Sequence, residues 1–483
     1  MKNTVSTYLK IGFALLLILF STHGSQLRAQ ELGTAYFTDS YTFRHTMNPA
    51  FAPSKGYVAI PVLGNLNMSM QGNLHMDALL YPNPEYGVVK GAEKTATFMH
   101  PAISADEALS NFNKGSNQLL MDLDVTLASV GFEQWGGFNT IELKQRTNMG
   151  VSLPYELFEM AKDLGNRSYD ITDMGMRVES YTELAMGHSR QLTDNLRAGA
   201  KVKLLFGTAR ADLEIDHLHA SFEGNQWVLE GEAKGEVNLH GASFKQSAPK
   251  EYKSHEGTYQ QVNGLNNDGF GISGFGAGID LGAVYSFRHM GMDWLDGLTL
   301  SAALTDLGFI SWGSTLVARN AGEQFVFDGF HDVAVKTNGT GGGFTDQSDS
   351  YSDQLADFAH LVDESEQGST TTMLAATMKL GAEYELPMYK QLSFGLLGTH
   401  RFNGDYSWTE GRLSANWKAL NWFDAAVSLS VGSYGVSMGW ITSFHPKGVN
   451  IFLAMDHTSF KTTANLVPLN SNVGFAMGVS VNL

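Results

Sequence analysis

Residues 473–483 alternate without interruption between large apolar and small or polar side chains. The apolar positions are Val473, Phe475, Met477, Val479, Val481 and Leu483, and between them lie Gly474, Ala476, Gly478, Ser480 and Asn482. Because successive side chains of a strand point to opposite faces, this pattern predicts a strand with one apolar face. Combined with an export signal at the other end of the chain, it indicates a barrel in the second membrane of an envelope. That limits the function to transport, export or anchoring.

The N-terminal residues have the pattern of a secretory signal peptide. The first ten residues carry two lysines and no acid, and an apolar run of ten, IGFALLLILF, follows them. Polar and small residues continue to Ala29, after which we expect cleavage, so residues 1–29 are the predicted signal peptide. The apolar run is too short for a spanning helix, which needs about 20 residues, although an uncleaved anchor is the alternative.

Composition restricts how such a chain can enter a membrane. It has no cysteines, so we expect no disulfides and no lipid attached through cysteine. No later segment has 18 uninterrupted apolar residues, which leaves a closed barrel as the spanning structure that satisfies every backbone group in lipid. The net charge of −17 argues against a nucleic-acid partner, which needs a basic face.

Prolines and alternation divide the mature chain into two parts. Residues 30–56 contain Pro49 and Pro53, which rule out a central strand, whereas regular alternation begins at Tyr57. We therefore predict an N-terminal plug segment at 30–56 and an outer-membrane β-barrel at 57–483. The fifteen segments with strand character are 57–70, 119–132, 137–153, 178–191, 196–222, 226–240, 274–287, 297–309, 373–386, 391–402, 406–418, 423–432, 435–444, 448–457 and 472–483.

The segments between these strands include three long loops, 71–118, 241–273 and 313–372. Loops of this length are usually functional or disordered. We predict a short amphipathic helix at 154–165, which starts with proline and ends with Gly165. Further short helices are expected at 106–112 and 351–363.

Charges lie on one face only of several predicted strands, as a water-filled or plugged lumen requires. Aromatic residues near strand ends predict girdles at the two water–lipid boundaries; they are Trp135, Trp312, Trp408, Trp417, Trp422, Trp440 and Phe444. A soluble β-sandwich also alternates and is the alternative fold, but its strands are usually shorter, about 5–6 residues.

The motifs that could indicate a nucleotide, metal or catalytic site are weak. Residues 269–274 match G-x-G-x-x-G but precede a predicted strand, whereas a phosphate-binding loop opens a helix. His217 and His219 share a strand face, yet a metal site needs three or four ligands. An acidic group in the loop 313–372 lacks the spacing of a calcium loop. His188-Ser189 and His457-Thr458 have no spacing that indicates catalysis. We therefore expect no cofactor, no metal and no catalytic residue.

Several short motifs resemble a family of uncharacterised Bacteroidetes-type outer-membrane proteins. The motifs are Tyr36-Phe37, Tyr41, Arg44-His45, Asn48-Pro49-Ala50-Phe51, Gly56-Tyr57-Val58, Ile60-Pro61, GIDLGAVY at 278–285 and LTDLGFISW at 304–312. That family is similar to the long-chain fatty-acid transporter barrels and to the barrel subunit of the gliding-associated secretion system. The resemblance implies about 14 strands. It also implies that Asn48-Pro49-Ala50 belongs to a hatch folded into the lumen.

Together these observations predict an all-β protein, a transmembrane antiparallel β-barrel of about 14 strands with an N-terminal lumen plug and short helices. Its surroundings would be outer-membrane lipid. The first functional hypothesis is uptake or binding of small hydrophobic molecules. The plug and ligand-contact residues it implies are Arg44, His45, Asn48, Pro49, Ala50 and Phe51. The alternative is a docking platform for secreted protein cargo or a secretion complex. An outer-membrane enzyme is a third hypothesis that no motif supports.

Overall fold

A computed structural model describes residues 32–89, 94–163, 167–222, 227–251, 257–267, 269–288, 295–320, 325–327, 361–457 and 472–483. The predicted signal peptide and its cleavage site lie outside these ranges. No helix in the described ranges is long and apolar enough to cross a membrane.

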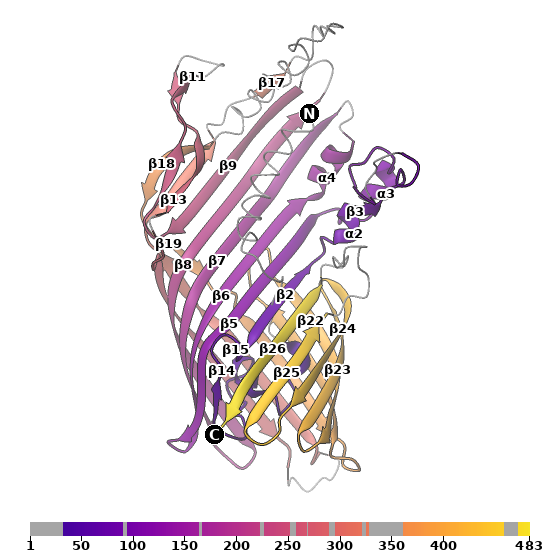
Figure 1. The fold of residues 1–483 in the computed structure, drawn as a ribbon, viewed down its shortest axis with the longest axis vertical. Helices are drawn as coiled ribbons and strands as arrows, with labels where there is room; N and C mark the ends of the chain where they lie inside the picture. The colour runs from indigo at the N-terminus through magenta and orange to yellow at the C-terminus, as the bar shows by residue number, and fades with distance from the viewer. Residues whose placement is uncertain are drawn as a thin grey trace.

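A single antiparallel sheet closes on itself as a barrel with 14 strand positions (Figure 1). In order around the wall these are β1 (Tyr57–Ala59) with β2 (Leu66–Gly72), β5 (Ser116–Gln134), β6 (Gly137–Pro154), β7 (Ser168–Gln191), β8 (Leu196–Ser221), β14 (Gly274–Ser286), β15 (Leu298–Trp312), β19 (Thr370–Met373) with β20 (Thr377–Glu385), β21 (Leu392–Arg401), β22 (Trp408–Leu420), β23 (Phe423–Gly432), β24 (Gly435–Phe444), β25 (Val449–Asp456) and β26 (Val473–Asn482). The seam pairs the last strand with the first, Tyr57 opposite Asn482 and Leu66 opposite Met477.

The side chains of the wall are mostly apolar outside and mostly small or polar inside. On β23, Val427, Leu429 and Val431 are exposed, whereas Ser428 and Ser430 between them are buried. On β26, Ala476 and Ser480 are buried against the lumen, which puts the predicted apolar set on the outer face. The predicted barrel is confirmed, and the sandwich alternative is wrong because a sandwich turns its apolar faces inward.

The first wall strand is interrupted, so the predicted continuous strand at 57–70 is wrong. Pro61 has no N–H to contribute to the ladder, and Val62 has a positive φ of 65°. A side chain at Gly64 would collide with Ala59, because a Cβ there would lie 2.6 Å from the Ala59 Cβ. The chain therefore leaves the ladder after β1 and rejoins it at β2.

The fifteenth predicted strand lies outside the closed wall. Residues 196–207 of β8 pair with β14, whereas residues 209–221, the upper half in Figure 1, pair with β9 (Trp227–Leu239). This upper extension continues through β16 (Thr315–Asn320), β17 (Phe325–Phe327) and β18 (Leu361–Gln367), as Figure 1 shows. The predicted helix at 351–363 is wrong at residues 361–363, which belong to β18, and its remainder lies outside the described residues.

The predicted loop 71–118 is largely folded. It contains α2 (Met76–Leu79), β3 (Leu80–Pro82), β4 (Thr95–Thr97) and α3 (Ala105–Leu109), and α4 (Tyr155–Lys162) confirms the predicted amphipathic helix. These elements share an apolar cluster in which the rings of Phe112 and Phe158 stack with centroids 3.9 Å apart. The loop 241–273 likewise contains antiparallel strands that pair in a nested order. The outer pair is β10 (Ala242–Gln246) with β13 (Val262–Asn267), and the inner pair is β11 (Lys250–Glu251) with β12 (Thr258–Tyr259).

The aromatic residues of the predicted girdles differ in exposure. Trp135, Trp417 and Trp422 are exposed near the short turns between strands. Trp312 and Trp408 are buried, so their assignment to a girdle is wrong. The Trp312 ring occupies the space that Gly207 leaves free, and its Nε1 donates to Thr372 at 2.9 Å.

Candidate functional site

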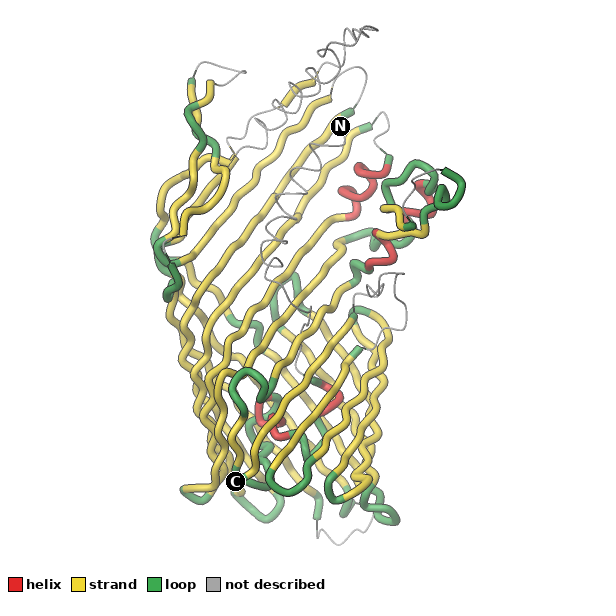
Figure 2. Tube along the Cα trace, in the orientation of Figure 1, coloured by secondary structure: helices red, strands yellow, loops and turns green. Residues whose placement is uncertain are grey.

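Residues 32–56, here called the lumen segment, lie inside the ring of strands rather than in its wall. The segment contains two short 3-10 helices, η1 (Gly33–Ala35) and η2 (Thr42–Thr46). Figure 2 shows short helical turns within the lower part of the ring. The sequence favours this irregular path because two prolines prevent a regular strand.

An apolar core joins the lumen segment to the inner face of the wall. Tyr36, Phe37, Phe43 and Met47 are at most 4% exposed. The wall residues in the same cluster include Phe138, Leu397, Ala426, Ile441, Phe452, Ala454 and Ala476. Tyr41 meets Phe452 edge to face with ring centroids 4.8 Å apart, a favourable geometry for an aromatic pair.

Glycines in the wall make room for the aromatic side chains of the segment. A Cβ at Gly395 would lie 2.3 Å from the Phe37 ring, and one at Gly381 would lie 2.8 Å from the Tyr36 ring. No real Cβ approaches a ring this closely, so larger residues at either position would require the ring to move. The fit is therefore specific to this segment.

A polar contact fixes the start of the segment. The backbone N–H groups of Gly33 and Thr34 donate to Asp456 at 2.6 and 3.0 Å, and the Thr34 hydroxyl also donates to that carboxylate. Arg412 Nη1 lies 3.2 Å from Asp456 and donates to the Thr34 hydroxyl at 2.9 Å. Ser428 completes the group, 2.8 Å from Thr34. We call Thr34, Arg412, Ser428 and Asp456 the polar clamp.

The Asn-Pro-Ala motif is held against β14 and β15. Asn48 Nδ2 donates to the carbonyl oxygens of Ala283 and Ala302 at 3.4 and 3.3 Å, and Asn48 Oδ1 accepts from the Ala50 N–H at 2.9 Å. Asn48 can come this close to β14 because Gly282 has no side chain, since a Cβ there would lie 2.0 Å from Asn48 Oδ1. Asn48 is fully buried.

The structure brings together all six residues that the sequence singled out. Arg44 lies over the ring of Phe51, 4.2 Å from its centroid, and Arg44 Nε donates to the Tyr36 carbonyl at 3.0 Å. His45 contacts the Tyr57 hydroxyl at 2.7 Å. Pro49 packs with its neighbours against Gly199 of the wall.

Two titratable groups of the segment have displaced pKa values. Burial lowers the pKa of His45 to about 3, although the Glu142 carboxylate 3.7 Å away opposes this effect. Burial alone would raise the pKa of Asp39, but Arg44 and Lys418 together lower it to about 2. At neutral pH His45 is therefore uncharged and Asp39 is ionised.

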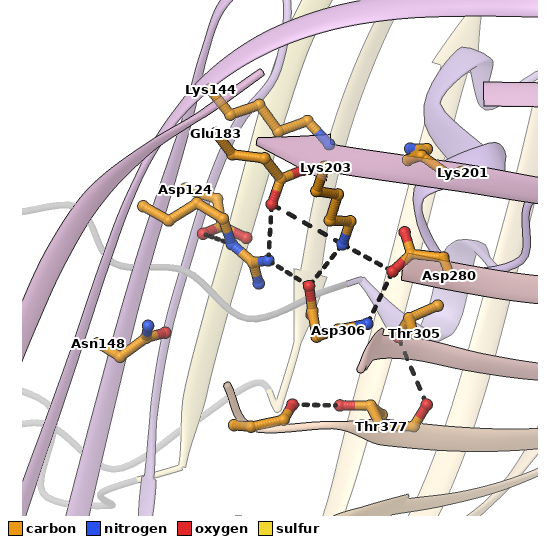
Figure 3. A network of polar contacts seen from close by, with 12 residues as sticks. Asp124, Lys144, Asn148, Glu183, Lys201, Lys203, Asp280, Thr305, Asp306 and Thr377 are labelled. Atoms are coloured by element: carbon orange, nitrogen blue, oxygen red, sulfur yellow. Dashed lines mark hydrogen bonds and ion pairs between the residues drawn. The ribbon is translucent and has the colours of Figure 1, made fainter. Parts of the chain in front are cut away.

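A network of paired charges lies on the inner face of the wall (Figure 3). Arg146 lies 3.0 Å from Asp124, 3.2 Å from Glu183 and 2.7 Å from Asp306. Lys203 lies 2.8 Å from Asp280 and 2.5 Å from Asp306. These residues come from six different wall strands, β5, β6, β7, β8, β14 and β15. The network therefore links six consecutive strands on the inner face of the wall.

Two cavities border this network. The larger, with a volume of about 30 Å³, is lined by Gly33, Asp122, Asp124, Arg146, Asp306, Thr377, Lys379, Thr399, Arg401, Trp408, Glu410 and Asp456. The smaller, with a volume of about 20 Å³, is lined by Thr46, Asn65, Asn67, Asp124, Thr126, Lys144, Arg146, Glu183, Lys201, Lys203 and Asp280. Most of the lining residues are charged or polar, and each cavity touches one residue of the lumen segment, Gly33 or Thr46.

Sequence reasoning missed this charged network and the polar clamp. Glu142, Lys144 and Arg146 occupy alternate positions of β6, a signal that would have placed three charges on the lumen face. Their partners on other strands could not be identified without the register of the sheet. The contacts of Thr34 with residues near the end of the chain leave no local signal at all.

The candidate metal and catalytic residues form no recognised site. Among the described residues no three His, Cys, Asp or Glu side chains are placed to hold a metal ion, and His219 instead pairs with Asp170 at 2.5 Å. His188 contacts Asn139. His457 Nδ1 is hydrogen-bonded to the Ser437 hydroxyl, and His457 Nε2 lies 3.5 Å from Glu410. Ser437 lines neither of the two cavities, so neither brings a substrate to its hydroxyl.

Comparison with solved structures finds two toluene transporters and a FadL homologue. The toluene transporter TbuX of Ralstonia pickettii aligns at 9% identity over 91% of this chain and 93% of its own, with a TM-score of 0.42. The toluene transporter TodX of Pseudomonas putida aligns at 10% identity over 94% and 95%, with a TM-score of 0.41. A FadL homologue of Pseudomonas aeruginosa aligns at 11% identity over 90% and 91%, also with a TM-score of 0.41. These similarities are too loose to carry an argument about substrate.

No curated protein matches the sequence. A family model does, over residues 49–456, and it is described as a family of unknown function, DUF5723. The match begins at Pro49, so it leaves out Asn48 and most of the lumen segment, and it covers every wall strand from β1 to β25. The chain therefore belongs to the DUF5723 family.

Proposed function

We propose that this protein is an outer-membrane channel for small molecules and that the lumen segment is its plug. The observation that carries the proposal is an apolar outer wall around a segment that occupies the lumen and is held to the wall mainly by contacts that involve side chains. Among the described residues, the backbone-to-backbone hydrogen bond between segment and wall is at the last residue of the segment, where the Leu483 N–H donates to the Gly56 carbonyl at 2.7 Å. A segment held in this way can leave without unfolding the wall, whereas a wall strand cannot.

The proposed orientation follows from the two ends of the barrel. Outer-membrane barrels have short periplasmic turns and longer extracellular loops. Here the short turns include Trp135-Gly136 and the connection at 421–422, and the seam residue Asn482 lies at the same end. We place that end in the periplasm and the folded elements α2, α3 and α4 outside the cell.

We infer small hydrophobic molecules as the first substrate class. The wall that the plug covers is apolar at Phe138, Leu397, Ile441 and Phe452. Withdrawal of the plug would expose this surface inside the barrel, where a small apolar molecule could replace part of the buried area. Burial of apolar surface is worth about 25 cal/mol per Å², so such a molecule would be held without a specific polar contact.

Small polar solutes are the second candidate class, and the two cavities favour it. Their linings are dominated by charged and amide side chains. An apolar molecule gains little there, because the polar groups would lose their partners or their water. The docking hypothesis rested on the loop 313–372 and on the resemblance to the secretion subunit.

The described residues of that loop, 313–320, 325–327 and 361–372, mostly belong to strands that extend the sheet, and they do not favour docking over transport.

A reversible crosslink tests the plug. Thr34→Cys with Ser428→Cys places two thiols where hydroxyl oxygens now lie 2.8 Å apart, within reach of a disulfide after small adjustment. The chain has no native cysteine to interfere. In proteoliposomes, oxidation should stop uptake of toluene or of glucose, and reduction should restore it.

The two single-cysteine variants are the matched controls and should respond to neither treatment. Restored uptake of toluene alone supports the first class, and restored uptake of glucose alone supports the second. Equal uptake by oxidised and reduced protein would show that the lumen segment is not a plug. Absence of uptake by reduced and unmodified protein alike would contradict the channel itself.

A further inference from the structure

A charged pair joins opposite sides of the wall. Arg401 is the last residue of β21 and Asp122 lies on β5, and these strands are seven positions apart in either direction around the 14-strand ring. Arg401 Nη1 and Nη2 lie 2.7 and 3.2 Å from the two carboxylate oxygens of Asp122. Nη2 also donates to Asn148 Oδ1 on β6 at 3.4 Å. The Arg401 and Asp122 side chains are only 11% and 13% exposed, so the pair lies inside the lumen rather than on its rim.

The loop at 402–407, which connects β21 to β22, reaches the same opposite side. Tyr406 is 9% exposed, and its ring fills the space left by two glycines of neighbouring strands, Gly150 on β6 and Gly175 on β7. A Cβ at Gly150 would lie 2.9 Å from Tyr406 Cε1, and one at Gly175 would lie 3.8 Å from the Tyr406 hydroxyl oxygen. Because β6 and β22 are also seven positions apart, Tyr406 crosses the lumen.

The loop is a compact turn held by its own hydrogen bonds. The Tyr406 N–H donates to the Asn403 carbonyl and the Ser407 N–H to the Gly404 carbonyl, both at 3.1 Å. The Asn403 N–H donates to the Ser407 hydroxyl at 2.9 Å. Gly404 has a positive φ of 56°, which a glycine adopts readily. The loop therefore behaves as one unit, and we call Arg401 and this loop the strap.

The strap is bonded differently to the two sides of the wall. On its own side it continues into β21 and β22, and the Phe402 N–H donates to the Ala376 carbonyl at 2.8 Å. On the opposite side every contact named above involves a side chain, as does the hydrogen bond from Gln118 Nε2 to the Asp405 carbonyl at 2.8 Å. Among the described residues, no backbone-to-backbone hydrogen bond joins the loop to β5, β6 or β7. The strap can therefore leave the opposite side without breaking the sheet.

The strap and the lumen segment block the lumen at successive levels. Arg401 and Asp122 line the larger cavity together with Gly33, at the start of the lumen segment. The volume of that cavity, about 30 Å³, has room for about two water molecules. β22 runs from the strap to the short connection at 421–422, so the strap lies at the end that we place outside the cell. A solute that enters from outside meets the strap before the plug.

We propose that the strap is a second gate, which closes the outer end of the lumen and opens independently of the plug. The proposal rests on the channel function, because a conducting lumen cannot stay crossed by an ion pair and a buried tyrosine. Opening moves Arg401 away from Asp122 and Tyr406 away from the two glycines. Water at the outer end then reaches both charges, which limits the cost of separating the pair.

Thiol labelling measures opening without any transport. Thr399 lies on the inner face of β21 and lines the larger cavity, and Thr399→Cys introduces a single thiol because the chain has no cysteine. A fluorescent maleimide should label it slowly in the purified full-length protein in detergent. Tyr406→Ala should raise the labelling rate about tenfold, since it removes the buried ring that holds the loop against β6 and β7 and so increases the open fraction.

Tyr389→Ala is the matched control. Tyr389 lies in the connection between β20 and β21, at the other end of β21, where it is 46% exposed and accepts a hydrogen bond from Trp417. This variant should be labelled at the rate of the Thr399→Cys protein. Unaltered heat-dependent migration in SDS gels would show that both variants fold. Equal labelling rates in the two tyrosine variants would overturn the strap as a closure.

A crosslink tests the strap as a gate. Gln118→Cys and Asp405→Cys replace the two residues whose contact joins the strap to β5, and a short bis-methanethiosulfonate reagent would connect them through bonds that a reductant cleaves. In proteoliposomes the crosslink should stop uptake of toluene or of glucose, and dithiothreitol should restore it. Ser116→Cys with Ser152→Cys is the control pair. Their hydroxyls lie 2.6 Å apart on the neighbouring strands β5 and β6, so the same reagent should leave uptake unchanged.

The outcomes separate the gate from the channel. Uptake that the strap crosslink does not slow, or equal inhibition by both crosslinked pairs, would overturn the gate and leave the channel proposal standing. Absence of uptake by every form, together with faster labelling in Tyr406→Ala, would contradict the channel proposal and support the strap as a closure of the lumen.

Discussion

The backbone N–H and the hydroxyl of Thr34 both donate to the carboxylate of Asp456, 422 residues further along the chain. The same carboxylate is paired with Arg412, which is itself buried. One acidic side chain of the wall therefore holds the start of the lumen segment. Asp456 is the position where a single substitution should release that segment with little effect on the barrel.

Asp456→Asn should weaken docking of the lumen segment by about 3 kcal/mol, because it removes one partner of a buried ion pair that also accepts the segment's N–H groups. Protease cleavage near the start of the segment would measure its release. Asp424→Asn is the control: Asp424 faces the lumen from β23 but pairs with His445 rather than with the segment. Equal cleavage of both variants would contradict the role of the clamp.

Gly395→Val should displace the Phe37 ring, since even a Cβ at Gly395 would lie 2.3 Å from it. We expect an increase in channel conductance in planar bilayers. Gly398→Val, three residues along the same strand, should be tolerated, because a Cβ there would lie 3.9 Å from its nearest neighbour. If both variants conduct like the unmodified protein, the segment does not block the lumen.

Acidification should release the lumen segment. The docked His45 has a pKa of about 3, below its ordinary 6.5, so the released segment binds more protons between these values and docking weakens as pH falls from 6.5 towards 3. The pKa of Asp39 is about 2 in the docked segment and 3.8 in the released one. Docking therefore weakens further as the pH falls from 3.8 to about 2, where the carboxylate becomes protonated. Conductance recorded against pH should therefore rise on acidification.

His45→Gln removes the titrating imidazole and should shift the onset of that rise to below about pH 4, where only Asp39 still responds. An unchanged profile in this variant would show that another group controls release. The comparison is informative because a glutamine amide can still reach the Tyr57 hydroxyl that His45 contacts now.

Met477→Lys should destabilise the barrel in a bilayer by about 2–4 kcal/mol, the cost of a lysine on the lipid face near the midplane. Met477 lies on the outer face of β26. Asn482→Lys, on the inner face at the turn end of the same strand, is the control and should cost far less. Urea unfolding in lipid vesicles would measure both, and equal effects would contradict contact of the outer face with lipid.

The sequence was a good guide to the wall because the alternation of a strand is a local property. Residues 473–483 could be placed on β26, with the apolar set outside, from their pattern alone. Interruptions could not be predicted so well. Pro61 and Gly64 looked compatible with a strand, and only the neighbouring strands show that the chain leaves the ladder there.

The interior was less predictable because its contacts join residues far apart in the chain. Asn48 could be singled out through a motif, but Gly282, which makes room for it, looks like any other glycine of a strand. Trp312 was assigned to a membrane boundary because tryptophan near a strand end is common there. Its burial against Gly207 depends on the branching of the sheet at β8, which no local pattern encodes.

The seam between β26 and the first wall strand sets an order for assembly. The lumen segment comes before β1 in the chain, yet its clamp partners Arg412, Ser428 and Asp456 lie on strands made near the end. Arg412 follows Thr34 by 378 residues and Ser428 follows it by 394. The first residues of the folded chain therefore cannot reach their final contacts until the last strands have been synthesised, so a molecule truncated before β25 would lack the group that holds its N-terminal end.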